Sequence, residues 1–219
     1  EAALAKSETQ TQASNELNFY YYDRPTCNPH WASIVEKSLQ ISEVSRLFCV
    51  LSALLSGDKK HNSSTAEKIR VWRVSQTNWE VQADFSIDTN IRTAGINFMR
   101  KFGWQDNMPI VCLMVRDSKY LLHSSLHKDK VWDYHSYRDS EISTYKNAVA
   151  WLLNRGYWVV RMGHDLWKPF PINHPHFIDY PFQEDKNGMH EIWLYKNCCL
   201  SISTGSGPEA YATIYKKPM

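Results

Sequence analysis

The run Ile110-Val111-Cys112-Leu113-Met114-Val115 decides the fold of this chain. A short, continuously apolar run without alternation is typical of a strand that is covered on both faces of a parallel sheet. A second run of the same kind, Tyr157 to Met162 (YWVVRM), follows after a stretch with helical spacing. Strand, helix and strand in this order predict an α/β fold of the Rossmann-like class, with a mainly parallel sheet flanked by helices.

A helix is expected between these two strands, and further elements surround them. The helix begins at Asp139 or Ser140 and ends at Gly156, since Asp or Ser before an apolar run and Gly after it are common helix boundaries. The polar segment 118–137 ahead of it is interpreted as a long loop. The other elements expected in this part are a helix at 91–102, a short strand at 177–180, a helix at 189–196 and a strand at 200–203.

The first 85 residues have a different pattern. Residues 1–16 are polar and lack a basic region followed by an apolar core, so we expect a disordered leader rather than a signal peptide, in a chain cut from a longer protein. We expect residues 17–85 to be the tail of a separate domain and residues 86–219 to be the Rossmann-like domain, with a sheet left incomplete at its C-terminal end. The elements expected in the tail are strands at 18–23 and 69–74 and helices at 31–39 and 44–55.

Charge and cysteine content exclude several classes of protein. The formal net charge of +2 is too small to predict a nucleic-acid partner, and no run reaches the roughly 18 apolar residues of a membrane-spanning helix. The five cysteines form no CxxC, which favours a reducing compartment over a disulfide framework or a zinc ribbon. We therefore expect no transmembrane segment, no metal and no cofactor, in a cytoplasmic protein for which a peripheral position at the inner membrane stays open.

The turn Thr204-Gly205-Ser206-Gly207 follows the last expected strand and precedes Pro208 and Glu209. Free backbone N–H groups at the start of a helix bind anions, so this turn is a candidate phosphate or sugar site. A tight structural turn is the alternative. Glu209 is placed to accept hydrogen bonds from ribose or sugar hydroxyls, or else to stabilise the first helical turn.

Two arginines strengthen the case for an anion. Arg116 directly follows the first strand and Arg161 lies at the carboxyl end of the second, and ligands of open parallel sheets bind at that edge. The fork of an arginine suits diphosphate oxygens. For both residues the alternative is an ion pair with a nearby carboxylate. Trp167, among prolines, is left open between packing and stacking on a base or sugar.

Four motifs in order carry a resemblance that covers about residues 80–219, with only a faint likeness over 18–57. They are Val115 to Tyr120 (VRDSKY), Tyr137-Arg138-Asp139, Gly156 to Gly163 (GYWVVRMG) and Ser203 to Pro208 (STGSGP). With these motifs the chain resembles a family of bacterial glycosyltransferases of surface-polysaccharide loci and, more distantly, the fucosyltransferase-like branch of the GT-B fold.

The resemblance implies a metal-independent transferase that moves a sugar from a nucleoside diphosphate to a glycan or lipid-linked acceptor. Residues 86–219 would then bind the nucleotide sugar as the C-terminal half of a GT-B-like architecture, and 17–85 would belong to the acceptor side. Arg116 matches an arginine of that branch, and Asp117 stands at the next position, where the branch often has a second arginine. Either an acid/base role or a loop-orienting role is open for Asp117. The expected catalytic residues are Arg116, Asp117 and Arg161, and the expected donor-binding residues are Arg138, Thr204, Gly205, Ser206, Gly207 and Glu209. The alternatives are a non-catalytic nucleotide or phosphosugar binding module and a protein-interaction domain.

Overall fold

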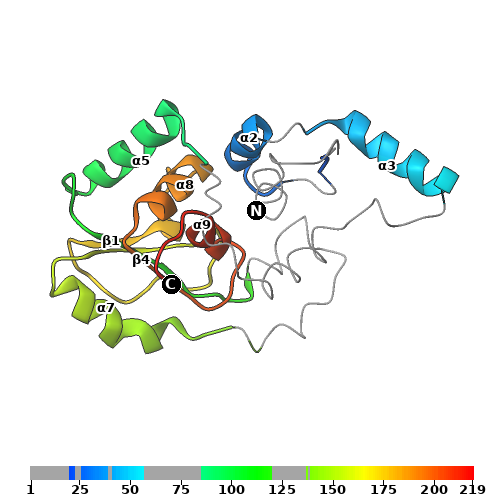
Figure 1. The fold of residues 1–219 in the computed structure, drawn as a ribbon. Coiled ribbons are helices and arrows are strands. Elements are labelled where there is room, and N and C mark those ends of the chain that lie inside the picture. The colour runs from blue at the N-terminus through cyan, green and yellow to red at the C-terminus, as the bar shows by residue number, and fades with distance from the viewer. Residues whose placement is uncertain (1–19, 23–25, 39–40, 57–84, 120–136, 138) are drawn as a thin grey trace. The chain divides into compact units, whose positions relative to one another are not determined.

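The computed structural model describes residues 20–22, 26–38, 41–56, 85–119, 137 and 139–219 (Figure 1). The chain divides into two compact units, Glu1–Ser86 and Ile87–Met219. Each unit is described by itself below. The second unit holds the sheet and the candidate site.

The second unit is built on a four-stranded, all-parallel sheet with the strand order β3-β2-β1-β4. The predicted α/β Rossmann-like class is therefore confirmed, and both apolar runs are strands at the centre of the sheet. All residues of β1 and β2 are buried, as a sheet covered on both faces requires. The strands are β1 (Ile110–Met114), β2 (Trp158–Arg161), β3 (Phe177–Asp179) and β4 (Leu200–Ser203).

Helices cover both faces of this sheet (Figure 1). On one face, Val149, Leu152 and Leu153 of α7 pack into a core with alternate residues of β1 and β2, such as Leu113 and Val159. On the other face, α5 and α8 lie against each other. The described helices of this unit are α5 (Thr89–Lys101), α7 (Lys146–Leu153), α8 (Gly188–Asn197) and α9 (Glu209–Ile214), with short 3-10 turns η4 (Ile142–Tyr145) and η5 (Tyr180–Phe182).

A close approach joins α5 to α8. A Cβ atom on Gly95 would collide with the side chain of Trp193, so only glycine lets the two helices come this near. Asp88 caps α5 by accepting a hydrogen bond from the backbone N–H of Ile91 at 2.9 Å. The glycine thus permits the close packing of the two helices, and the cap stabilises the first turn of α5.

One predicted boundary was wrong. The helix expected from Asp139 or Ser140 begins later, as η4 at Ile142 followed by α7. The N–H of Ser140 donates to the carbonyl oxygen of Arg116 at 3.1 Å, and the carboxylate of Glu141 accepts from Ser143 N–H. Residues 139–141 are therefore held against the end of β1 and line the candidate site instead of extending the helix.

The first unit contains α2 (Pro29–Ser38) and α3 (Glu43–Ser56), close to the helices expected at 31–39 and 44–55. Ser45 of α3 is buried, whereas six large apolar side chains of the same helix are exposed. These exposed residues are Val44, Leu47, Phe48, Val50, Leu51 and Leu54.

Several expectations for the N-terminal part lie outside the described residues, namely the leader at 1–16 and the strand at 69–74. Of the strand expected at 18–23 the structure describes 20–22, where Tyr20 forms one isolated bridge with Ile41.

Candidate functional site

The candidate site lies at the carboxyl edge of the sheet, where the segments after β1, β2 and β4 meet. The chain runs from β1 outward to β2 and β3, and then returns to place β4 on the other side of β1. The order therefore reverses between β1 and β4, and open α/β sheets bind ligands at such a switch point. Arg116 and the Gly-rich turn follow the two strands concerned.

A pair of hydrogen bonds joins the ends of β1 and β4. The backbone N–H of Arg116 donates to Oγ1 of Thr204 at 3.0 Å, and the N–H of Thr204 donates to the carbonyl oxygen of Met114 at 3.2 Å. Thr204 thus fixes where Arg116 leaves the sheet. This is a positioning role for a residue that the sequence placed in direct donor binding.

The Arg116 side chain is mostly buried and lies beside an acidic residue. Its Nε is 3.3 Å from Oδ1 of Asp139, and its side chain is 11% exposed. Burial raises the pKa of Asp139, while the charge of Arg116 lowers it. The contact is not a well-aligned hydrogen bond, because Oδ1 of Asp139 is buried and accepts none from the described residues. Arg116 therefore keeps hydrogen-bonding capacity within the described part of the chain.

The Gly-rich turn supports itself. Gly205 has φ of +80°, a left-handed conformation that favours glycine. Oε2 of Glu209 accepts hydrogen bonds from the hydroxyl of Ser203 at 2.9 Å and from the N–H of Ser206 at 3.3 Å. The carboxylate of Glu209 thus already accepts the hydrogen bond that the Ser206 N–H could give to an anion. This favours a tight structural turn over an anion site for this segment. Gly207 is exposed beside it.

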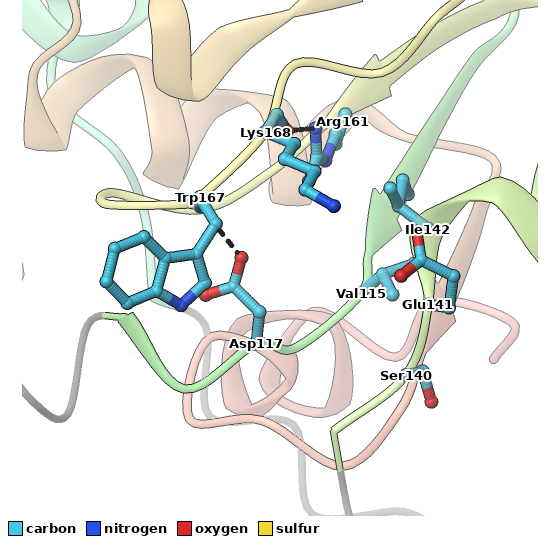
Figure 2. Close-up of a pocket in the computed structure, with 8 residues that line it drawn as sticks. All are labelled: Val115, Asp117, Ser140, Glu141, Ile142, Arg161, Trp167 and Lys168. Carbon is cyan, nitrogen blue, oxygen red and sulfur yellow. Dashed lines mark hydrogen bonds between the residues drawn. The ribbon is translucent and has the colours of Figure 1, made fainter.

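A pocket of about 170 Å³ opens between the ends of β1 and β2 (Figure 2). Its walls come from the segment after β1, the residues ahead of η4, and the loop that follows β2. It is lined by Val115, Asp117, Ser140, Glu141, Ile142, Arg161, Trp167 and Lys168.

Arg161 lines this pocket, but its guanidinium is already bonded to other groups of the protein. The strand register pairs Arg161 with Asp179 on β3, and Nη1 lies 3.4 Å from both carboxylate oxygens. Nη1 also donates to the carbonyl oxygen of Lys168 at 2.8 Å. Burial lowers the pKa of Arg161 and raises that of Asp179, and the mutual charges oppose both shifts. The alternative reading, an ion pair at the edge of the core, describes this geometry.

Asp117 orients the loops around the pocket. One carboxylate oxygen accepts from the N–H of Lys119 at 3.0 Å, and the other accepts from the N–H of Trp167 at 3.1 Å. Nζ of Lys119 continues the connection by contacting Asp165 at 2.7 Å and the carbonyl oxygen of Leu166 at 3.1 Å. Of the two roles left open for Asp117, this geometry matches the loop-orienting one.

The structure therefore divides the expected site residues into two groups. Arg161 and Asp117 share the pocket at the ends of β1 and β2, whereas Arg116 and Thr204 are bonded to each other at the ends of β1 and β4. Arg138 lies outside the described residues.

Sequence reasoning missed two carboxylates and one cation. Asp139 and Asp179 are the partners of the two arginines, and Lys168 lines the pocket. A signal for Asp179 was present in the sequence. Arg161 ends an apolar strand, and a buried arginine is stable only with a carboxylate nearby, which the next expected strand supplies at Asp179.

A further pair, unnoticed in the sequence, joins His164 in the loop after β2 to Glu191 on α8. Nε2 of His164 is 2.8 Å from Oε1 of Glu191, whose side chain is only 7% exposed. The hydrogen bond to Glu191 raises the pKa of His164, although desolvation opposes the shift. Neither residue lines the pocket.

Among the described residues, no three His, Cys, Asp or Glu side chains are grouped as a metal site would need. The helices described also include none with the length and apolar character needed to cross a membrane. No family model, no curated protein and no solved structure matches this chain.

Proposed function

We propose that this chain carries the donor-binding part of a metal-independent glycosyltransferase. The transferred sugar would come from a nucleoside diphosphate and would go to a glycan or lipid-linked precursor of a surface polysaccharide. The class of reaction comes from the four sequence motifs. The support from the structure is the position and the bonding of one residue, Arg116.

Arg116 combines three properties that a diphosphate ligand requires. It follows β1 at the switch point of a parallel sheet, where nucleotides bind in folds of this class. Its backbone is fixed by Thr204 and Ser140, so the side chain starts from a defined position. Its guanidinium donates no hydrogen bond to the described residues and contacts Asp139 only at 3.3 Å. This single observation carries the proposal.

The chemistry needs positive charge near the departing diphosphate. As the glycosidic bond to the donor breaks, negative charge builds on the leaving phosphate oxygens, and positioned donors lower the barrier most when they point at that charge. Arg116 supplies two parallel N–H donors for this purpose once a phosphate replaces Asp139 as its partner. Asp117 and Thr204 act by holding the loops that carry the site.

A non-catalytic phosphosugar binding module is the second candidate. The observation in its favour is that Arg161 and the Ser206 amide already have internal acidic partners, Asp179 and Glu209. Fewer groups then remain to stabilise a leaving group than the sequence motifs suggested. Such a module binds the same ligands and transfers no sugar.

Calorimetry with a panel of nucleoside diphosphates and nucleotide sugars tests the proposal. We expect binding to the wild-type chain that survives EDTA and is lost in Arg116→Ala. The matched control is Arg100→Ala, which removes an exposed arginine of α5 that is paired with Asp106. Binding without transfer in an assay with acceptor glycans favours the module. Absence of nucleotide binding, or equal binding by both variants, refutes the donor site.

A further inference from the structure

The pocket at the ends of β1 and β2 is too small for a nucleotide. Its volume of about 170 Å³ lies well below the roughly 300 to 1,000 Å³ of pockets that enclose drug-sized ligands. It therefore accommodates a single ring. A whole nucleotide sugar can place only one of its parts there.

The pocket has an apolar floor and a polar rim. Val115 and Ile142 are 1% and 7% exposed and belong to the core that packs against α7. The rim carries the carboxylates of Asp117 and Glu141 and the ammonium of Lys168. Figure 2 shows the Lys168 side chain reaching across the pocket toward the side of Glu141 and Ile142. A ligand in this pocket can therefore contact apolar side chains at the floor and form hydrogen bonds with the charged side chains at the rim.

The charges of the pocket disfavour phosphate. Asp179 at 3.4 Å offsets the positive charge of Arg161, and Nη1 also donates to the carbonyl oxygen of Lys168. Of the remaining charged groups at the rim, Asp117 and Glu141 are negative and Lys168 is positive. Ionised carboxylates only accept hydrogen bonds, and the oxygens of an ionised phosphate also act chiefly as acceptors. The rim instead suits a ligand that is rich in hydrogen-bond donors.

We propose that this pocket binds the hydroxylated ring of a sugar, and that any diphosphate lies outside it, on the side of Arg116. Sugar hydroxyls donate to Asp117 and Glu141 and accept from Lys168, while the carbon face of the ring contacts Val115 and Ile142. The proposal rests on the proposed function and divides the ligand between two places at the carboxyl end of β1, one toward β2 and one toward β4. The ring belongs either to the donor or to the acceptor, because both present the same chemistry.

Trp167 extends the apolar surface beyond the pocket. Its side chain is exposed, and its backbone N–H is held by Asp117 at 3.1 Å. Figure 2 shows the indole beside Asp117, at one edge of the group of lining residues. A part of the sugar that projects from the pocket meets this aromatic surface.

Ligand-observed NMR with the 219-residue chain tests this division. The probes are free neutral monosaccharides, glycosides of the acceptor type, nucleoside diphosphates, and nucleotide sugars. The decisive variant is Glu141→Gln, which keeps the shape and an oxygen that can accept from Ser143 N–H. Its matched control is Glu184→Gln, an exposed glutamate that does not line the pocket.

We expect the affinity of Glu141→Gln for sugar-containing ligands to be at least about tenfold lower than that of the wild-type chain. The reason is that hydrogen bonds to charged groups are about twice as strong as those between neutral groups. Nucleoside diphosphates without a sugar should bind both variants equally. A greater loss for nucleotide sugars than for glycosides identifies the donor ring, and the reverse identifies the acceptor ring.

Two results would overturn the proposal. The first is a gain in nucleoside diphosphate affinity in Glu141→Gln, which would make the pocket an anion site and leave the proposed function intact. The second is the absence of any sugar contact in the wild-type chain. If diphosphate binding that depends on Arg116 persists in that case, only this inference fails; if it is lost as well, the proposed function fails too.

Discussion

The carboxyl edge of the sheet carries two arginines, Arg161 at the end of β2 and Arg116 just after β1, and the two are held very differently. Arg161, beside β2, has a carboxylate at 3.4 Å and a carbonyl at 2.8 Å, and its side chain is 3% exposed. Arg116, toward β4, has one contact at 3.3 Å and makes no hydrogen bond from its side chain to the described residues. The difference lies in the side-chain hydrogen bonds, since both arginines have a carboxylate within 3.4 Å.

The largest expected effect is on stability at the β2 end. Asp179→Ala removes the carboxylate that balances a buried guanidinium, and breaking one side of a buried ion pair typically costs about 3 to 5 kcal/mol of unfolding free energy. Denaturant unfolding measures this loss. Asp106→Ala is the control, because its partner Arg100 is more than half exposed and such pairs contribute only about 0.2 to 1 kcal/mol. Equal losses in both variants would remove the contrast between the two arginines.

The next effect concerns ligand affinity at the β4 end. Arg116→Ala should weaken nucleoside diphosphate binding by about 2 to 5 kcal/mol, since truncating one partner of a buried charge pair has effects of this size. Its unfolding free energy should fall by less than that of Asp179→Ala. Calorimetry and denaturant unfolding on the same preparation measure both quantities. A variant that loses stability while its folded fraction keeps the affinity would show that Arg116 is structural, like Arg161.

A smaller effect is expected in the Gly-rich turn. Glu209→Ala removes the acceptor for Ser203 and for the Ser206 amide, at a cost of about 1 to 2 kcal/mol in unfolding free energy. Glu209→Gln keeps an oxygen and should lose less. Inorganic phosphate should not bind to Glu209→Ala more tightly than to the wild type. If it does, the turn is an anion site that Glu209 occupies from within.

The last and smallest effect depends on pH and concerns the pair of His164 and Glu191. The hydrogen bond to Glu191 raises the pKa of His164 above its usual value of 6.5 in the folded state. The folded protein therefore binds this proton more tightly than the unfolded chain, so the contribution to stability is complete below pH 6.5 and is lost as the pH rises through the higher, folded pKa.

Denaturant midpoints between about pH 6 and 9 test this dependence, with His164→Gln as the comparison. The difference between wild type and variant should shrink as the pH rises. A difference that stays constant across this range would show that His164 does not titrate against Glu191.

The short-range pattern of the sequence was enough for most of the secondary structure. Short, continuously apolar runs predicted β1 and β2, because strands covered on both faces have no polar side and runs of this length are too short for most helices. The order of strands and helices predicted a parallel sheet, and a parallel sheet places the residues that follow each strand at one edge. Arg116 and Thr204 could thus be assigned to the same edge without coordinates.

Periodicity also predicted the helix α3 correctly, although it could not predict which face is covered. The apolar residues Leu47, Phe48 and Leu54 repeat with helical spacing and are exposed, while Ser45 is buried. Spacing reports that a helix has an apolar side. What lies against that side is a property of the tertiary structure.

The partners of the charged residues were decided only by the tertiary structure. Arg161 meets Asp179 because the register of β2 and β3 places them side by side, although 18 positions separate them in the chain. Asp139 reaches Arg116 because Ser140 is bonded to the end of β1. Local periodicity encodes burial, so the sequence pattern predicted which elements form and at which edge of the sheet the charges gather. Which charge is neutralised depends on register and loop path, which arise only when distant segments pack together.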